Sequence, residues 1–90
     1  MEISKAIEDV IKERERQDET WGVNGHDSFI WLALIGEEYG ELCTEVLENK
    51  FKIASNDEIL RYLKERTRDE AVQLAAITVA FIEYLDGGTM

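Results

Sequence analysis

The chain contains no proline, and its apolar residues recur at helical spacing. Proline interrupts helices, and glycine weakens them; there are only 6 glycines in 90 residues. This length allows one domain with a modest core. We therefore predict an all-α fold with a single domain over residues 1–90. Its expected parts are an antiparallel helical hairpin and a preceding N-terminal helix, which assemble into a helical bundle as an oligomer.

Start and stop signals divide the chain into three expected helices. The first carries Ile3, Ile7, Val10 and Ile11 on one face. The expected segments are a helix over residues 2 to about 18, a loop over 19–27, a helix from a cap at Asp27 or Ser28 to about Asn49, and a helix from the Ser55-Asn56-Asp57-Glu58 capping box to Gly87-Gly88. A further start signal at Thr67 predicts either a kink or a new helix there.

Two pairs of polar side chains lie inside the apolar stripes of the second and third helices. They are Glu38 with Glu41, and Glu70 with Gln73. Isolated buried carboxylates are unfavourable, so they require partners or a cation. Glu41 and Glu38 precede Ser55 by 14 and 17 residues, whereas Glu70 and Gln73 follow it by 15 and 18. An antiparallel hairpin therefore brings all four to one level, as in the divalent-metal sites of helical bundles.

Other faces of the same helices predict contacts between copies. The side of the second helix opposite its acids is small, with Ala33, Gly36, Gly40 and Cys43, which would allow another helix to approach closely. Cys43 is accordingly expected to be a packing residue. The third helix is also apolar on a second side, so we expect a homodimer or a dimer of dimers. The contact is expected near Val72, Ala76 and Val79.

The charge balance limits the partners. Twenty acids against 10 bases give a net charge of −10, which disfavours nucleic acid polymers and anionic membranes and favours cations. Residues 17–49 hold eight acids and no base, and residues 50–68 hold six bases. This asymmetry suits a site for metal ions and a polyanion, although the bases also fit a solvated connector. The basic residues are Lys50, Lys52, Arg61, Lys64, Arg66 and Arg68.

The cysteine content and hydropathy indicate a compartment. A single cysteine excludes an internal disulfide and a cysteine-based zinc site, and it favours the reducing cytoplasm. The first ten residues hold three acids and no apolar run, so we expect no signal peptide. No segment approaches the roughly 20 apolar residues that span a bilayer.

The string Gly36-Glu37-Glu38-Tyr39-Gly40-Glu41, followed after a basic connector by Glu70-x-x-Gln73, resembles the MazG-like all-α nucleoside triphosphate pyrophosphohydrolases. Their motif is Glu-Glu-x-x-Glu on one helix and Glu-x-x-Asp on the next. The segment Arg16-Gln17-Asp18-Glu19-Thr20-Trp21-Gly22, with His26 and Trp31 following, is similar to the N-terminal part of small stand-alone members. The resemblance covers roughly residues 13–85, and it is the combination of these features that is specific.

The resemblance implies a Mg²⁺-dependent enzyme, with Mn²⁺ as a second suitable ion. Water would attack the α-phosphorus of a nucleoside triphosphate and give a nucleoside monophosphate and pyrophosphate. Glu38, Glu41 and Glu70 would bind the metal ion, and Glu37 would orient or deprotonate the water. These roles agree with the preference of Mg²⁺ for carboxylates and substrate phosphates.

Gln73 stands where the family has aspartate. An amide oxygen can bind a hard cation but brings no charge. The site would then hold fewer metal ions, hold them more weakly, recruit Glu45, or have lost catalysis.

The remaining site predictions concern the substrate. The base pocket would include Trp21, His26 and Trp31, because nucleobases stack on aromatic rings. The alternative is that Trp31 is a core residue and His26 a loop or capping residue. Lys50, Lys52 and Arg66 are expected to contact phosphates.

Two further functions fit the same sequence. One is a non-catalytic acidic helical protein that binds a partner, for example as a polyanion mimic. The other is a nucleotide-binding relic that has lost the chemistry. A mimic needs its acids on the outside, whereas an enzyme needs Glu38 and Glu41 on the inside.

Overall fold

The computed structural model describes residues 3–21, 27–51 and 57–87, and all of these except Asp27 and Gly87 are helical. The helices are α1 (Ile3–Trp21), α2 (Ser28–Phe51) and α3 (Asp57–Asp86). The all-α prediction is therefore confirmed for the described residues. None of these helices combines the length and hydropathy needed to cross a membrane.

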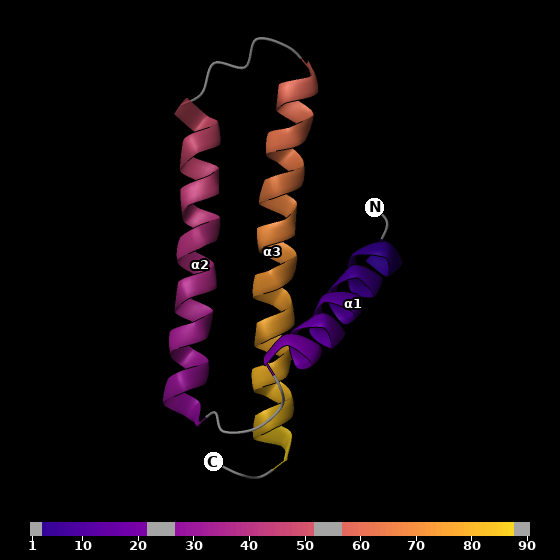
Figure 1. Ribbon diagram of the computed structural model, residues 1–90, viewed down its shortest axis with the longest axis vertical. Coiled ribbons are helices and arrows are strands. Elements are labelled where there is room, and N and C mark those ends of the chain that lie inside the picture. The colour runs from indigo at the N-terminus through magenta and orange to yellow at the C-terminus, as the bar shows by residue number, and fades with distance from the viewer. Residues whose placement is uncertain (1–2, 22–26, 52–56, 88–90) are drawn as a thin grey trace.

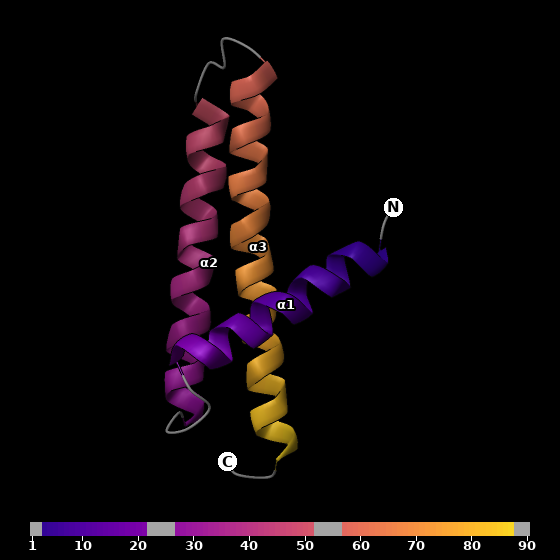
Figure 2. The ribbon, with the colours of Figure 1, turned by 45° about the vertical axis from the view of Figure 1, so that its right-hand side comes forward.

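Helices α2 and α3 form the antiparallel hairpin, and α1 crosses α3 obliquely on one side of it (Figures 1 and 2). Within the described residues the backbone of α1 contacts α3 but not α2. The middle helix α3 therefore supplies the core. Among the residues whose burial is described, the buried apolar side chains all come from α3: Leu63, Ala76, Ile77 and Ala80.

The second apolar side of α3 was predicted to meet another copy, but part of it meets α1. Ala76 is completely buried within the single chain, so placing Ala76 at a contact between copies was wrong. Small residues at Ala76 and Ala80 let α1 approach the α3 backbone. Val79 remains 37% exposed beside this crossing.

Local signals explain where α2 begins. The Asp27 carboxylate accepts a hydrogen bond from the Ile30 amide at 3.0 Å, as expected of an N-cap. The Ser55 and Asn56 part of the next capping box lies outside the described residues, and α3 begins at Asp57. Helix α1 extends to Trp21, so the expected loop starts later than residue 19.

The start signal at Thr67 does not break α3, which runs without interruption from Asp57 to Asp86. The Thr67 hydroxyl donates to the Leu63 carbonyl at 3.0 Å, one turn earlier. A threonine in this position satisfies its own hydroxyl inside a helix. The chain therefore forms one long helix, and the prediction of a new helix at Thr67, one of the two alternatives, was wrong.

Candidate functional site: a cluster of three carboxylates

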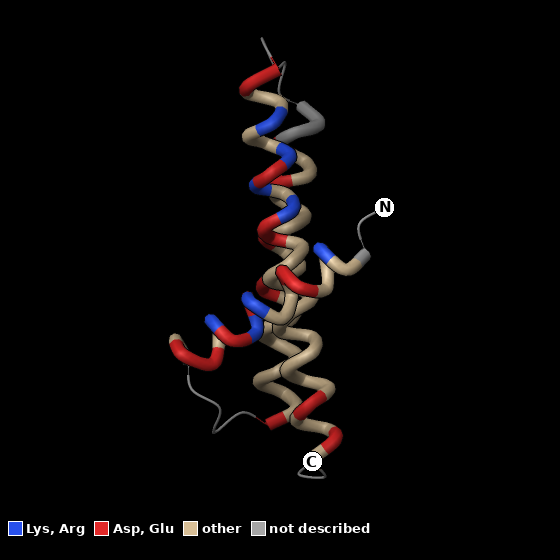
Figure 3. The backbone as a smooth tube through the Cα atoms, turned by 90° about the vertical axis from the view of Figure 1, so that its right-hand side faces the viewer, with Lys and Arg blue, Asp and Glu red and all other residues tan. Residues whose placement is uncertain are grey.

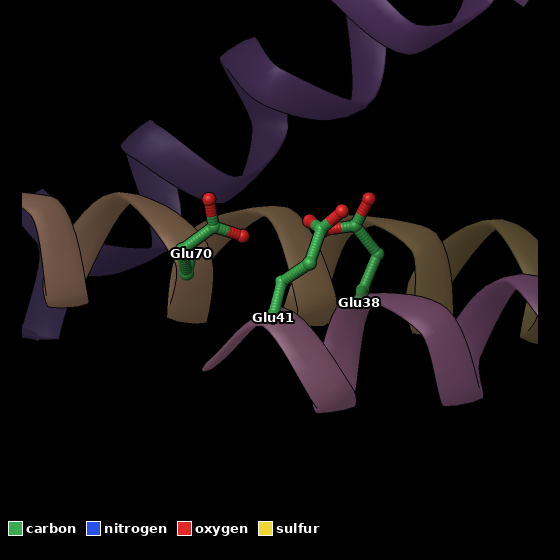
Figure 4. Close-up of side chains that lie close together, drawn as sticks. All are labelled: Glu38, Glu41 and Glu70. Atoms are coloured by element: carbon green, nitrogen blue, oxygen red, sulfur yellow. The ribbon is translucent and has the colours of Figure 1, made fainter. Parts of the chain in front are cut away.

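Three carboxylates from the two hairpin helices converge. Glu38 and Glu41 come from α2 and Glu70 from α3, and one oxygen of each lies within 4.8 Å of the others (Figure 4). The i, i+3 spacing puts the α2 pair on one side of its helix. The antiparallel register brings Glu70 opposite that pair. The two helices thus produce the arrangement expected from their equal distances to the connector.

Two of these carboxylates are partly buried, and each has one oxygen without a hydrogen-bond partner among the described residues. Glu38 and Glu70 are half-buried, and Glu41 is exposed. The Oε2 atom of Glu38 and that of Glu70 are buried without a hydrogen-bond partner among the described residues. Burial of unpaired carboxylate oxygens is unfavourable, so an additional positive group or proton would stabilise the cluster.

The pKa values of Glu38 and Glu70 reflect the burial and the close approach of these carboxylates. Burial, followed by repulsion from Glu41 and then from Glu70, raises the pKa of Glu38 from 4.5 to about 7. Burial and then repulsion from Glu41 also raise the pKa of Glu70, and the neighbouring Arg66 opposes that rise. The cluster therefore retains a proton more readily than separate carboxylates do.

An open cavity of about 600 Å³ lies beside the carboxylates. Its lining includes Glu41 and Glu70 of the cluster together with Glu37, the residue predicted to act on water. Arg66 and Glu45 lie on the same wall and form an ion pair at 2.7 Å. This volume lies within the range of small-molecule sites, so the cavity has room for a nucleotide phosphate chain.

Gln73 is not among the residues that line this cavity. Gln73 instead lines a second cavity, of about 400 Å³, between α1 and α3, together with Asp9, Arg16 and Arg68. Its backbone carbonyl accepts a hydrogen bond from the Gln17 side chain. Glu45, the alternative fourth ligand, lines the cavity beside the carboxylates, and its charge contributes to the raised pKa of Glu70.

The predicted substrate residues are only partly described. Trp31 is half-buried and packs with Phe81 and Tyr84, each pair having ring centroids 6.4 Å apart. Arg66 lies at the cavity. The side chains of Trp21 and Lys50, and the whole of His26 and Lys52, lie outside the described residues.

Helix α1 adds polar groups that the spacing argument did not include. Gln17 is 3% exposed, and it donates to the Glu13 carboxylate and to the Gln73 carbonyl, both at 3.3 Å. Arg16 forms an ion pair with Glu13 at 2.6 Å. The hydrogen bond to Glu13, together with the negative charge of Glu38, raises the pKa of Arg16. Arg16 and Gln17 belong to the segment that is similar to the small stand-alone family members. The helical periodicity of the sequence did not indicate that they would lie near the carboxylates.

Comparison of the chain with family models, with curated proteins and with solved structures gave no match.

Proposed function

We propose that the protein hydrolyses nucleoside or deoxynucleoside triphosphates to a nucleoside monophosphate and pyrophosphate, with Mg²⁺ or Mn²⁺ held by Glu38, Glu41 and Glu70. The observation that carries this proposal is the convergence of the three carboxylates within 4.8 Å. The unpartnered oxygens of Glu38 and Glu70 support it independently. An all-oxygen, all-carboxylate donor set fits a hard divalent cation.

When bound, the ion would supply positive charge that offsets the phosphates and favours loss of a proton from the attacking water. Glu37, on the wall of the same cavity, would orient that water and accept its proton. The water oxygen then forms the new bond to the α-phosphorus, the bond from that phosphorus to the bridging oxygen breaks, and pyrophosphate leaves.

Arg66 would bind the phosphate chain. Its guanidinium is held at the cavity wall by Glu45 and by the Tyr62 hydroxyl, at 2.7 Å and 3.4 Å. Guanidinium groups form charge-assisted hydrogen bonds to carboxylates and phosphates alike. Arg66 can therefore exchange contact with Glu45 for contact with the substrate, which would free Glu45 to approach the metal ion.

Half-burial of Glu38 and Glu70 favours this function over mimicry of a polyanion, which requires acids on the outer surface. We also propose that the protein acts as a homodimer or a dimer of dimers in the cytoplasm. The basis is the small core of the single chain and its lone cysteine.

The test is incubation with a panel of ribo- and deoxynucleoside triphosphates and Mg²⁺, with chromatographic identification of products. We expect equal amounts of monophosphate and pyrophosphate, lost in Glu38→Gln and kept in Glu65→Gln, which removes an exposed acid elsewhere on α3. A diphosphate with orthophosphate would contradict the proposed reaction. Mn²⁺ binding without turnover of any triphosphate would favour the relic.

A further inference from the structure

The cavity between α1 and α3 has no role in the proposed reaction, yet three of the ten basic residues of the chain line it. They are Lys12 and Arg16 of α1 and Arg68 of α3. Charged residues of both signs gather where α1 passes α3 (Figure 3). The cavity volume of about 400 Å³ lies within the range of small-molecule sites. This concentration of positive charge makes the cavity a candidate site for an anion.

Two acids of the cavity are less exposed than the arginines with which they pair. The Glu13 side chain is 14% exposed and accepts hydrogen bonds from Arg16, which is 52% exposed, at 2.8 and 2.6 Å. The Asp9 side chain is 17% exposed and pairs with Arg68, which is 47% exposed, at 2.8 Å. Asp9 also pairs with Lys5 at 3.1 Å. The negative charges of Glu13 and Asp9 are therefore already neutralised, and the guanidinium groups are the accessible partners.

Both guanidinium groups keep donors for a ligand. A guanidinium carries five N–H donors. Arg16 bonds to Glu13 through Nε and Nη2, and Arg68 reaches Asp9 through Nη2. The Nη1 group of each arginine has no partner among the described residues. Phosphate oxygens accept paired N–H bonds from such groups, so two arginines from different helices can hold one phosphate.

Stabilisation of the fold explains only part of this arrangement. The Arg68–Asp9 pair joins α3 to α1. The Arg16–Glu13 pair and the pair of Lys12 with the preceding turn of α1 each join residues of the same helix. Exposed pairs within a helix contribute little to stability. The presence of Arg16 and Lys12 at the cavity is therefore not accounted for by helix packing.

The third acid of the cavity, Asp69, selects among anions. Asp69 is exposed, and it has no partner among the described residues. Its carboxylate would repel a bare phosphate, but it can accept hydrogen bonds from hydroxyl groups. A phosphate monoester that carries hydroxyl groups would satisfy the arginines and Asp69 together.

We propose that the α1–α3 cavity binds a sugar phosphate, with its phosphate held by Arg16 and Arg68 and its hydroxyl groups donating to Asp69. Lys12 adds a third positive charge at the phosphate. The net charge of −10 on the chain does not prevent this binding, because charges beyond about 8 Å are largely screened at physiological ionic strength. None of the three clustered glutamates lines this cavity, so the proposal does not depend on the proposed hydrolysis.

The test is an NMR titration with EDTA, without divalent metal ions and at constant ionic strength. The probes are inorganic phosphate, ribose 5-phosphate and adenosine monophosphate. We expect both esters to bind more tightly than inorganic phosphate and to shift the backbone amide signals of Arg16 and Arg68. Equal affinities of the two esters would assign the site to free sugar phosphates, and tighter binding of adenosine monophosphate would assign it to nucleotides.

Substitutions on α3 locate the phosphate. Arg68→Gln should weaken ribose 5-phosphate binding about 10-fold, the value of one hydrogen bond to a charged group. Arg61→Gln, which removes an exposed base of α3 outside the cavity, should keep the parental affinity. Circular dichroism checks that Arg68→Gln remains helical. Arg16→Gln, whose ion pair lies within α1, is the second variant, with the same expected loss.

Asp69→Asn separates the hydroxyl contact from the phosphate contact. It should abolish the preference for ribose 5-phosphate over inorganic phosphate without weakening the binding of inorganic phosphate, because it removes a negative charge. The proposal is overturned if neither ester binds at millimolar concentration, if the parent shows no preference for the esters, or if Arg68→Gln and Arg61→Gln weaken binding equally.

Glu38→Gln distinguishes this site from the proposed metal site. We expect this variant to bind ribose 5-phosphate with the parental affinity, because Glu38 does not line the cavity. Loss of binding would place the ester at the carboxylate cluster and would overturn the proposal. A failure to hydrolyse triphosphates would leave all of these expected affinities unchanged.

Discussion

The side-chain amide of Gln17 on α1 donates a hydrogen bond of 3.3 Å to the backbone carbonyl of Gln73 on α3. This contact fixes the crossing of the two helices one turn beyond Glu70. The same amide nitrogen reaches the Glu13 carboxylate, so the crossing includes a buried polar contact. The apolar residues Ile7 and Ile11 of α1 lie outside this contact, and each is more than half exposed.

The Gln17 contact predicts an asymmetric response to substitution. Gln17→Glu would place a buried carboxylate against two acceptors and should lower the free energy of unfolding by about 3 kcal/mol near pH 8. Gln17→Met, which removes the hydrogen bonds without adding charge, should lower it by about 1 kcal/mol. Urea unfolding measures both. Equal losses in the two variants would show that the amide makes no such contact.

The raised pKa of Glu38 predicts a pH dependence in the absence of metal ions. The folded chain holds a proton up to about pH 7, whereas the unfolded chain releases it near 4.5. Glu38 therefore adds stability below that range and loses it as the pH rises through 7, with a slope of at most about 1.4 kcal/mol per pH unit. Urea unfolding with EDTA from pH 4.5 to 8 measures this slope. Glu38→Gln should flatten it, and an unchanged slope in that variant would refute the assignment.

Metal ions should stabilise the folded chain, because they bind the assembled cluster and not the separated carboxylates. At a Mn²⁺ concentration of 100 times its dissociation constant, the gain should be about 2.7 kcal/mol. Thermal unfolding with and without Mn²⁺ measures it. Glu38→Gln should lose the gain while remaining folded, because the amide relieves repulsion. A parent-like response from that variant would place the metal elsewhere.

Gln73 provides a test of the ligand set. Gln73 lines the cavity between α1 and α3 and not the cavity beside the carboxylates. Gln73→Asp should therefore leave Mn²⁺ affinity unchanged in a calorimetric titration. Tighter binding, by about tenfold as ligand changes often produce, would bring Gln73 back as a metal ligand. An unchanged affinity combined with weaker binding in Glu45→Gln would assign the fourth position to Glu45.

Arg66 should act on substrate affinity. If it exchanges Glu45 for the phosphate chain, Arg66→Ala should raise KM about 10-fold, the value of one hydrogen bond to a charged group. Steady-state kinetics over a triphosphate concentration series measures this change. Arg61→Ala, which removes an exposed base earlier on α3, is the matched control and should have the parental KM. Equal increases in KM in the two variants would show that Arg66 acts only through its positive charge and makes no specific contact with the phosphates.

The helices and the meeting of the carboxylates could be predicted from the amino-acid order, because both depend on short-range periodicity. Spacing of i, i+3 sets the face shared by Glu38 and Glu41, and equal chain lengths on both sides of a connector set the level of Glu70. The Asp27 cap is local in the same way, because an N-cap bonds to an amide three residues away.

The position of α1, and the residues that it covers, depend on packing between helices and could not be predicted from the sequence. Ile7 and Ile11 share the apolar face of α1 but remain more than half exposed, whereas Gln17 on α1 and Ala76 on α3 are buried. Such a choice depends on the fit between two surfaces far apart in the chain, and helical periodicity within one segment contains no information about it. For the same reason the sequence predicted a kink or a new helix at Thr67, whereas α3 continues through this residue. Whether a threonine caps a new helix or bonds back to the preceding turn depends on what the helix packs against on either side.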